Sequence, residues 1–139
     1  LARLYARSAW AARQAGDTVE ALGLCVEGLA RAGQGSDGPG RAHLLCETAR
    51  SYQHRALREE GEPYARQALE MAERLGDVEL QVLSLAAYSE FPAHSTEESM
   101  ALATRAVDLA ETNRLLLPGL SAHTGLAYRF FGGVQRGTN

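Results

Sequence analysis

The chain of 139 residues carries a formal net charge of −3, which excludes the basic excess of a general nucleic-acid-binding protein. Ala and Leu are abundant whereas Ile and Lys are absent, so the composition predicts helices rather than strands. No apolar run is long enough to cross a bilayer, and no signal peptide is visible. We therefore expect one helical domain without membrane contact or direct nucleic-acid contact.

The two cysteines, Cys25 and Cys46, lie within apolar helical segments and do not form a CxxC motif. Free cysteines are among the most buried residues, and disulfides are rare in reducing compartments. We expect two buried free thiols and a cytoplasmic protein.

The first part of the chain predicts three helices. Residues 1–15 and 19–32 each repeat apolar side chains at steps of three and four, with a stop and restart at residues 16–18. Residues 33–40 contain four Gly and one Pro and predict a loop. A third helix is expected from Arg41 to about Glu59, followed by a tight turn at residues 60–63.

The fourth helix is expected to begin at Pro63, because the missing N–H of a proline has no partner at a first helical position. It carries small apolar residues on one face and ends at Gly76, after which Asp77 caps a fifth helix from Val78 to about Glu90. The fifth helix is apolar over most of its circumference, which predicts neighbours on several sides.

The last part of the chain predicts two further helices. Ser95 and Glu98 form a capping-box pattern, in which Ser95 accepts from a free backbone N–H and Glu98 reaches back to the cap. We expect the sixth helix to run from there to about Thr112, with Asn113 as its C-terminal cap. A seventh helix is expected over residues 115–131, and residues 134–139 resemble the start of an eighth.

Helix pairs recur along the chain. The third, fifth and seventh helices begin near residues 41, 78 and 115, a spacing of about 37 residues that is typical of a solenoid. Gly125-x-x-Tyr128-x-x-x-Gly132 resembles the first helix of a tetratricopeptide repeat, and Gly16-Asp17-x-x-x-Ala21 resembles its turn and second helix. Two further segments are similar to its second-helix pattern of small residues: Ala68-Leu69-x-x-Ala72 and Ala106-Val107-x-x-Ala110.

The resemblance implies an all-α protein, an α-solenoid of about seven helices in antiparallel pairs. Its units would span residues 1–32, 41–75, 78–112 and an incomplete 115–139, in a single domain over 1–139 that we expect to be a fragment of a longer chain. The phrase AERLGD at residues 72–77 is similar to helical-repeat regions of large bacterial LuxR-type activators and related signalling ATPases and kinases. That likeness implies a protein-interaction or self-association module of such a regulator.

Motifs for catalysis and metal binding are missing from the sequence. His43-x-x-Cys46 has the spacing of two metal ligands on one helix, but no second pair completes a site, so we expect a packed helix instead. No GxSxG, HExxH or Walker-type motif occurs, and a chain without Lys cannot supply a phosphate-loop lysine. We expect no enzyme activity, no cofactor and no metal.

In tetratricopeptide repeats the first helix of each pair lines a concave surface that binds peptides. The resemblance places Trp10, Arg13 and Arg129 on this surface, and a looser alignment adds Arg50, His54 and Tyr88. Arg and aromatic side chains are good binding anchors, and an arginine-lined groove favours an acidic segment or a C-terminal carboxylate. The alternative is that the arginines form a solvated face and that Trp10 seals the packing of the first repeat.

Two other functions stay open at this point. The repeats could be a structural spacer between other domains, or a helical sensor that holds a small ligand between helix pairs. A solenoid also exposes apolar faces at its ends. We therefore expect the isolated chain to self-associate through one end, as a symmetric pair.

Overall fold

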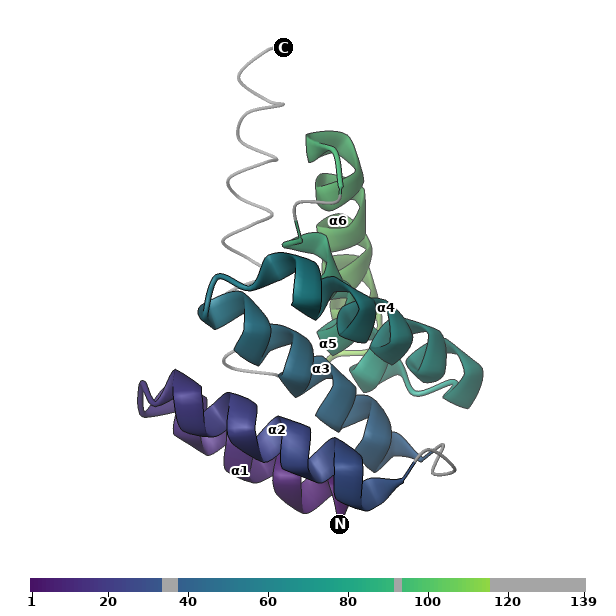
Figure 1. Cartoon of the computed structure of the whole chain (residues 1–139). Coiled ribbons are helices and arrows are strands. Elements are labelled where there is room, and N and C mark those ends of the chain that lie inside the picture. Colours follow the sequence, from purple (N-terminus) through teal and green to yellow (C-terminus); the bar gives the residue numbers. More distant parts are fainter. Residues whose placement is uncertain (34–37, 92–93, 116–139) are drawn as a thin grey trace.

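The computed structural model describes residues 1–33, 38–91 and 94–115, and over these residues it is all-helical with no strand (Figure 1). Six helices lie in these ranges: α1 (Ala2–Gln14), α2 (Thr18–Ala32), α3 (Pro39–His54), α4 (Arg58–Leu75), α5 (Val78–Ser89) and α6 (Thr96–Thr112). The predicted all-α class is therefore confirmed. The helix predicted over 115–131 lies, apart from Leu115, outside the described residues, and so does Arg129.

Side-chain caps begin three helices where the sequence predicts them. Asp17, Asp77 and Ser95 each accept a hydrogen bond, at 3.0–3.1 Å, from the backbone N–H three residues later. Each cap satisfies a donor that the helix's own hydrogen bonds leave free. The capping-box pattern predicts that Glu98 reaches back to the backbone of the Ser95 cap. In the structure its carboxylate lies 3.6 Å from the Nδ1 of His94 instead.

The other predicted helix ends differ little from the structure. α3 begins at Pro39, two residues before the predicted start, because Pro fits the first turn of a helix. Gly76 ends α4 in the left-handed conformation with a φ of 66°. Asn113 follows α6, and both its N–H and its side-chain Nδ2 donate to the Leu109 carbonyl.

The predicted turn between the third and fourth helices is wrong. α3 ends at His54, and the chain turns at residues 55–57, where Ala56 has a φ of 59°. α4 begins at Arg58 and carries two acidic residues in its first turn, where the helix dipole favours them. Pro63 therefore lies inside α4 and not at its first position.

Packing explains why Gly61 does not mark this turn. A Cβ on Gly61 would lie 2.9 Å from the Tyr52 Cβ and 3.1 Å from the Ala49 carbonyl oxygen. Gly61 thus lets α4 approach α3 closely, and the left-handed conformation falls on Ala56, which has to tolerate it. The glycine is used for helix contact rather than for the turn.

Small side chains form many of the contacts between helices. A Cβ on Gly28 of α2 would lie 2.6 Å from the Tyr5 Cβ of α1, so these two helices also pack at short range. Every described helix contains at least one Ala without exposed surface: Ala9, Ala21, Ala42, Ala49, Ala65, Ala68, Ala72, Ala87 and Ala106. Helices of the described part therefore approach one another closely through glycine and alanine.

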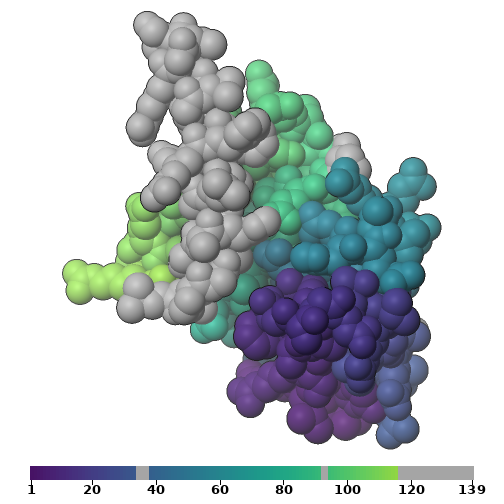
Figure 2. All heavy atoms as spheres, turned by 90° about the vertical axis from the view of Figure 1, so that its left-hand side faces the viewer, coloured from purple at the N-terminus to yellow at the C-terminus, as the bar shows by residue number. Residues whose placement is uncertain are grey.

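Contacts between the helices follow the order of the chain. α1 packs on α2, α3 on α4, and α5 on α6, while α3 also contacts α1 and α5. In addition, α2 contacts α3 and α4 contacts α5. As a result α1 and α2 lie at one end of the described part and α6 lies at the other (Figures 1 and 2).

α5 is covered on several sides, as its apolar sequence predicts. It contacts α3, α4 and α6, and Leu80, Val82 and Leu85 are among its buried residues. Neither α5 nor any other helix in the described ranges is long and apolar enough to cross a membrane.

Both cysteines are buried and free, which confirms the predicted thiols. The Sγ of Cys25 lies 3.7 Å from the Ser51 Oγ, and the Sγ of Cys46 donates to the Leu83 carbonyl at 3.7 Å. These weak contacts place the two thiols inside the helix packing.

Candidate functional site

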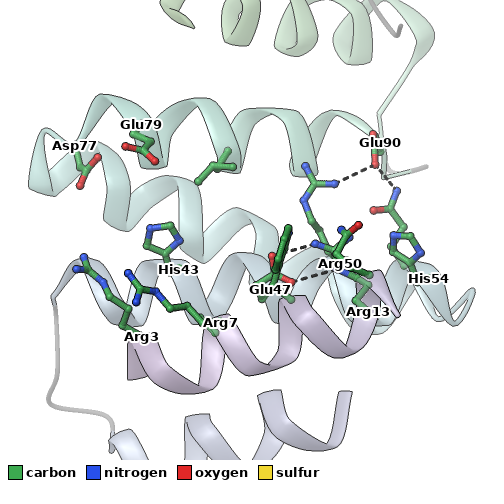
Figure 3. A pocket seen from close by; sticks show the side chains of 15 residues that line it. Arg3, Arg7, Arg13, His43, Glu47, Arg50, His54, Asp77, Glu79 and Glu90 are labelled. Carbon is green, nitrogen blue, oxygen red and sulfur yellow. Dashed lines mark hydrogen bonds and ion pairs between the residues drawn. The ribbon is translucent and has the colours of Figure 1, made fainter. Parts of the chain in front are cut away.

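An open groove of about 890 Å³ runs across α1, α3 and α5 (Figure 3). We call it the α1–α3–α5 groove. Most of the side chains that line it are charged or polar. They are Arg3, Ala6, Arg7, Trp10, Arg13, Gln14, His43, Glu47, Arg50, Gln53, His54, Asp77, Glu79, Leu83 and Glu90.

The groove residues of α1 and those of α3 follow the same spacing along their helices. Residues at steps of three and four share one face of a helix. On each of these helices, four groove residues follow one another at steps of four, three and four: Arg3, Arg7, Trp10 and Gln14 on α1, and His43, Glu47, Arg50 and His54 on α3. Equivalent faces of two neighbouring helices therefore form one surface.

Four of the six residues predicted for a concave binding surface line the α1–α3–α5 groove: Trp10, Arg13, Arg50 and His54. Tyr88 is not among the lining residues. Its ring packs edge-on against that of His94, with the centroids 4.4 Å apart. Tyr88 comes five residues after Leu83 and so points from another side of α5. Arg129 lies outside the described residues.

Arg13 of α1 and Glu47 of α3 form a two-point ion pair in the groove. The Arg13 Nε donates to Oε2 at 3.2 Å, and its Nη2 donates to Oε1 at 3.1 Å. The two side chains are only 10% and 13% exposed, so water screens the pair little. This geometry fixes the direction of the Arg13 guanidinium and joins α1 to α3.

Glu90, which follows α5, is held by two groove residues of α3. The Gln53 Nε2 donates to the Glu90 Oε2 at 2.8 Å, and the Arg50 Nη1 lies 4.0 Å from the same oxygen. The side chains of Arg50 and Glu90 are mostly buried. One face of α3 is therefore tied to α1 through Arg13 and to the end of α5 through Glu90.

The two predicted arginines of this region, Arg13 and Arg50, are thus already paired within the protein. Sequence reasoning missed five residues at the other end of the groove: Arg3, Arg7, His43, Asp77 and Glu79 (Figure 3). The spacing of helical residues could have predicted Arg3, Arg7 and His43. Arg3 and Arg7 come seven and three residues before Trp10, and His43 comes seven residues before Arg50.

This other end carries opposite charges on opposite sides. Arg3 and Arg7 extend into the groove from α1, and neither has an ion-pair partner among the described residues (Figure 3). Asp77 and Glu79 lie across from them, at the start of α5. We call Arg3 and Arg7 the basic wall, and Asp77 and Glu79 the acidic wall.

Both histidines of the groove favour the neutral form. Burial lowers the pKa of His43, and the nearby Arg3 adds to the effect. Burial also lowers the pKa of His54, with further contributions from Arg13 and Arg50. At neutral pH the charge of the groove therefore comes from its Arg, Asp and Glu side chains.

The His43-x-x-Cys46 spacing does not bring two ligands to one place. His43 lines the groove, whereas Cys46 is buried and its Sγ faces the Leu83 carbonyl. Within the described ranges no group of three His, Cys, Asp or Glu residues could hold a metal ion.

No protein-family model matches the chain, and no similar protein is found among curated proteins or solved structures. What the groove can bind therefore follows from its own side chains. These are two opposed charged walls, a set of internally paired charges, and Trp10, which is 52% exposed.

Proposed function

We propose that this chain is a protein-binding module that holds a segment of its partner in the α1–α3–α5 groove. The groove itself carries the proposal, because it is an open surface of about 890 Å³ built from three helices. Two contacts, Arg13 to Glu47 and Gln53 to Glu90, hold α1 and the end of α5 against α3 without a ligand. A preformed surface binds at a smaller entropic cost than one that must first be ordered.

The proposal includes the architecture, an α-solenoid of antiparallel pairs like that of tetratricopeptide repeats. In support of it, contacts within the pairs α1–α2, α3–α4 and α5–α6 are joined by contacts of α3 with α1 and α5. The first helices of successive pairs are then neighbours on the groove side. Such a stack offers an extended binding surface.

The parent protein in this proposal is a large cytoplasmic bacterial regulator of the LuxR type or a related signalling ATPase. The motif AERLGD at residues 72–77 favours this class of regulator. In such a regulator the module would recruit a partner protein or a second copy of the chain. An end-to-end pair would bury exposed apolar residues at the start of the chain, Leu1 and Leu4.

A peptide fits the groove better than a small apolar ligand does. Small-molecule sites are concave and mostly apolar. In contrast, ten of the fifteen residues that line the groove are Arg, His, Asp or Glu. Trp10 adds an exposed aromatic surface among them, and Trp is frequent at the energetically important positions of interfaces.

Trp10 also provides the test, because it is the single Trp of the chain and its fluorescence reports on the groove. Peptides without Trp, selected from a displayed random library on the 139-residue chain, would be titrated against its emission. We expect a saturable change in the intensity and wavelength of emission, and a higher melting temperature of the complex.

A matched control moves the fluorophore to the outer surface of α2. Val26 is 52% exposed, as Trp10 is, and it does not line the groove. In the double variant Trp10→Phe/Val26→Trp the same peptides should leave the emission unchanged. A library that yields no binder would favour the structural spacer, and binders that alter only the Val26→Trp emission would place the interface elsewhere.

A further inference from the structure

We propose that the groove selects a mixed-charge segment, one that presents acidic side chains to α1 and basic side chains to α5. This inference rests on the proposed peptide-binding role and adds the chemistry of the ligand. It comes from the basic wall and the acidic wall, which lie opposite each other at one end of the groove.

The basic wall needs negative charge from outside the described part of the protein. Arg3 and Arg7 are exposed, lie one turn apart on α1 and have no ion-pair partner in that part. Like charges four residues apart on a helix repel each other. A carboxylate that approaches both guanidinium groups relieves the repulsion and accepts charge-assisted hydrogen bonds.

The acidic wall, in contrast, favours positive charge on a ligand. Asp77 and Glu79 lie at the N-terminal end of α5, where acidic side chains interact favourably with the helix dipole. Asp77 uses Oδ1 to accept the Leu80 N–H, and Glu79 is exposed and makes no ion pair in the described ranges. An ammonium or guanidinium group of a ligand would therefore meet two carboxylates on this side.

The two walls do not neutralise each other. They belong to α1 and α5, which both contact α3 but share no contact with one another in the described part. A purely acidic segment would satisfy the basic wall and be repelled by the acidic wall, and a purely basic segment would suffer the reverse. A segment with both signs of charge satisfies both walls.

Charge selection is confined to this end of the groove. At the other end Arg13 is paired with Glu47, and Glu90 is held by Gln53 and approached by Arg50. Those charges are already compensated, so a ligand gains little from matching them. Successive side chains of an extended segment point in opposite directions. Alternating acidic and basic residues would therefore face the two walls in turn.

The experiment uses three fluorescein-labelled peptides of equal length, in which Glu alternates with Lys, Glu with Ser, or Ser with Lys. Binding to the whole chain is measured by fluorescence polarisation at low ionic strength, where exposed charges are least screened. We expect the Glu-Lys peptide to bind about tenfold more tightly than either of the others.

Two wall variants should change this order in opposite directions. Arg3→Glu/Arg7→Glu makes both walls acidic, so the Ser-Lys peptide should become the tightest and the Glu-Lys peptide should weaken by about tenfold. Glu79→Arg should instead favour the Glu-Ser peptide. The control Arg58→Glu/Arg66→Glu makes the same charge change on exposed residues of α4, outside the groove lining, and should leave the order unchanged.

The outcomes separate this inference from the function on which it rests. Equal binding of the three peptides, or an order that the wall variants do not alter, would overturn mixed-charge selection. Failure of all three to bind, while library-selected peptides still change the Trp10 emission, would overturn it too. If the selected peptides also fail to bind, the peptide-binding role itself is wrong.

Discussion

The guanidinium of Arg13 and the carboxylate of Glu47, 34 residues apart in the sequence, form two hydrogen bonds that join α1 to α3. Both side chains are largely shielded from water, so neither charge would be well hydrated if its partner were lost. Loss of one partner is therefore expected to destabilise the fold, and it would also alter the shape of the groove.

Glu47→Gln is expected to lower the free energy of unfolding by about 1–3 kcal/mol, because the Arg13 guanidinium keeps its charge without a counter-charge. Urea denaturation followed by circular dichroism measures the loss. The double variant Arg13→Met/Glu47→Leu should recover most of it, since no buried charge is left unpaired. A Glu47→Gln variant as stable as the wild type would mean that the guanidinium finds enough water in the groove.

Gly61→Ala is expected to destabilise the protein by about 1–3 kcal/mol, because the new Cβ would press against the Tyr52 Cβ and the Ala49 carbonyl oxygen. This cost exceeds the gain in helix propensity of about 1 kcal/mol. Gly23 in α2 is a matched control, since a Cβ there meets nothing within 4 Å. Gly23→Ala should stabilise by about 0.5–1 kcal/mol. If Gly61→Ala also raised the free energy of unfolding, α4 would be able to move away from α3 at little cost.

The two cysteines are expected to resist thiol reagents in the native protein. Burial raises the pKa of Cys46 to about 11 and also raises the pKa of Cys25, so little of the reactive thiolate is present. A disulfide reagent at neutral pH should modify both thiols only after denaturation. Val26→Cys, at an exposed position of α2, supplies a fast-reacting control. Native cysteines that react as fast as this control would contradict their burial.

Stability is expected to decrease as the pH falls below about 6.5, the usual pKa of His. Burial lowers the pKa of His43 and His54, so the unfolded chain takes up protons before the folded chain does. Between the usual value and the lowered folded value the unfolded state holds more protons, and the free energy of unfolding rises with pH.

The measurement compares the free energy of unfolding at about pH 7.5 and about pH 5.5, on either side of the usual His pKa. His43→Gln/His54→Gln should reduce the difference between the two values, because two groups that bind protons preferentially in the unfolded state are gone. A difference that the double variant leaves unchanged would assign the acid sensitivity to other groups.

The helices and most of their ends could be predicted because their signals are local. Asp17, Asp77 and Ser95 cap helices through backbone donors three residues away, and Gly76 ends α4 through its own φ. The turn at residues 55–57 could not be predicted in the same way. Gly61 has the residue type of a turn, but it serves the contact between α3 and α4.

The groove could be predicted only in part. The resemblance to a tetratricopeptide repeat was enough to predict Trp10 and Arg13 on a binding surface, but it does not tell which charges are already compensated. Arg13 has an ion-pair partner on another helix, α3, whereas Arg3 and Arg7 have none in the described part, although all three are arginines of α1. That distinction arises from tertiary contacts.

α3 is the common support of both charged walls. Leu44 is buried in a cluster with Ala6 and Ala9 of α1, whereas the adjacent Leu45 is buried in a cluster with Leu80 of α5. These two leucines set how each wall sits on α3, although neither lines the groove. Altering the volume of Leu44 or Leu45 would change the distance between the two walls. Under the proposed function, partner preference would therefore be adjustable from the interior of the protein, without any change to the residues that line the groove.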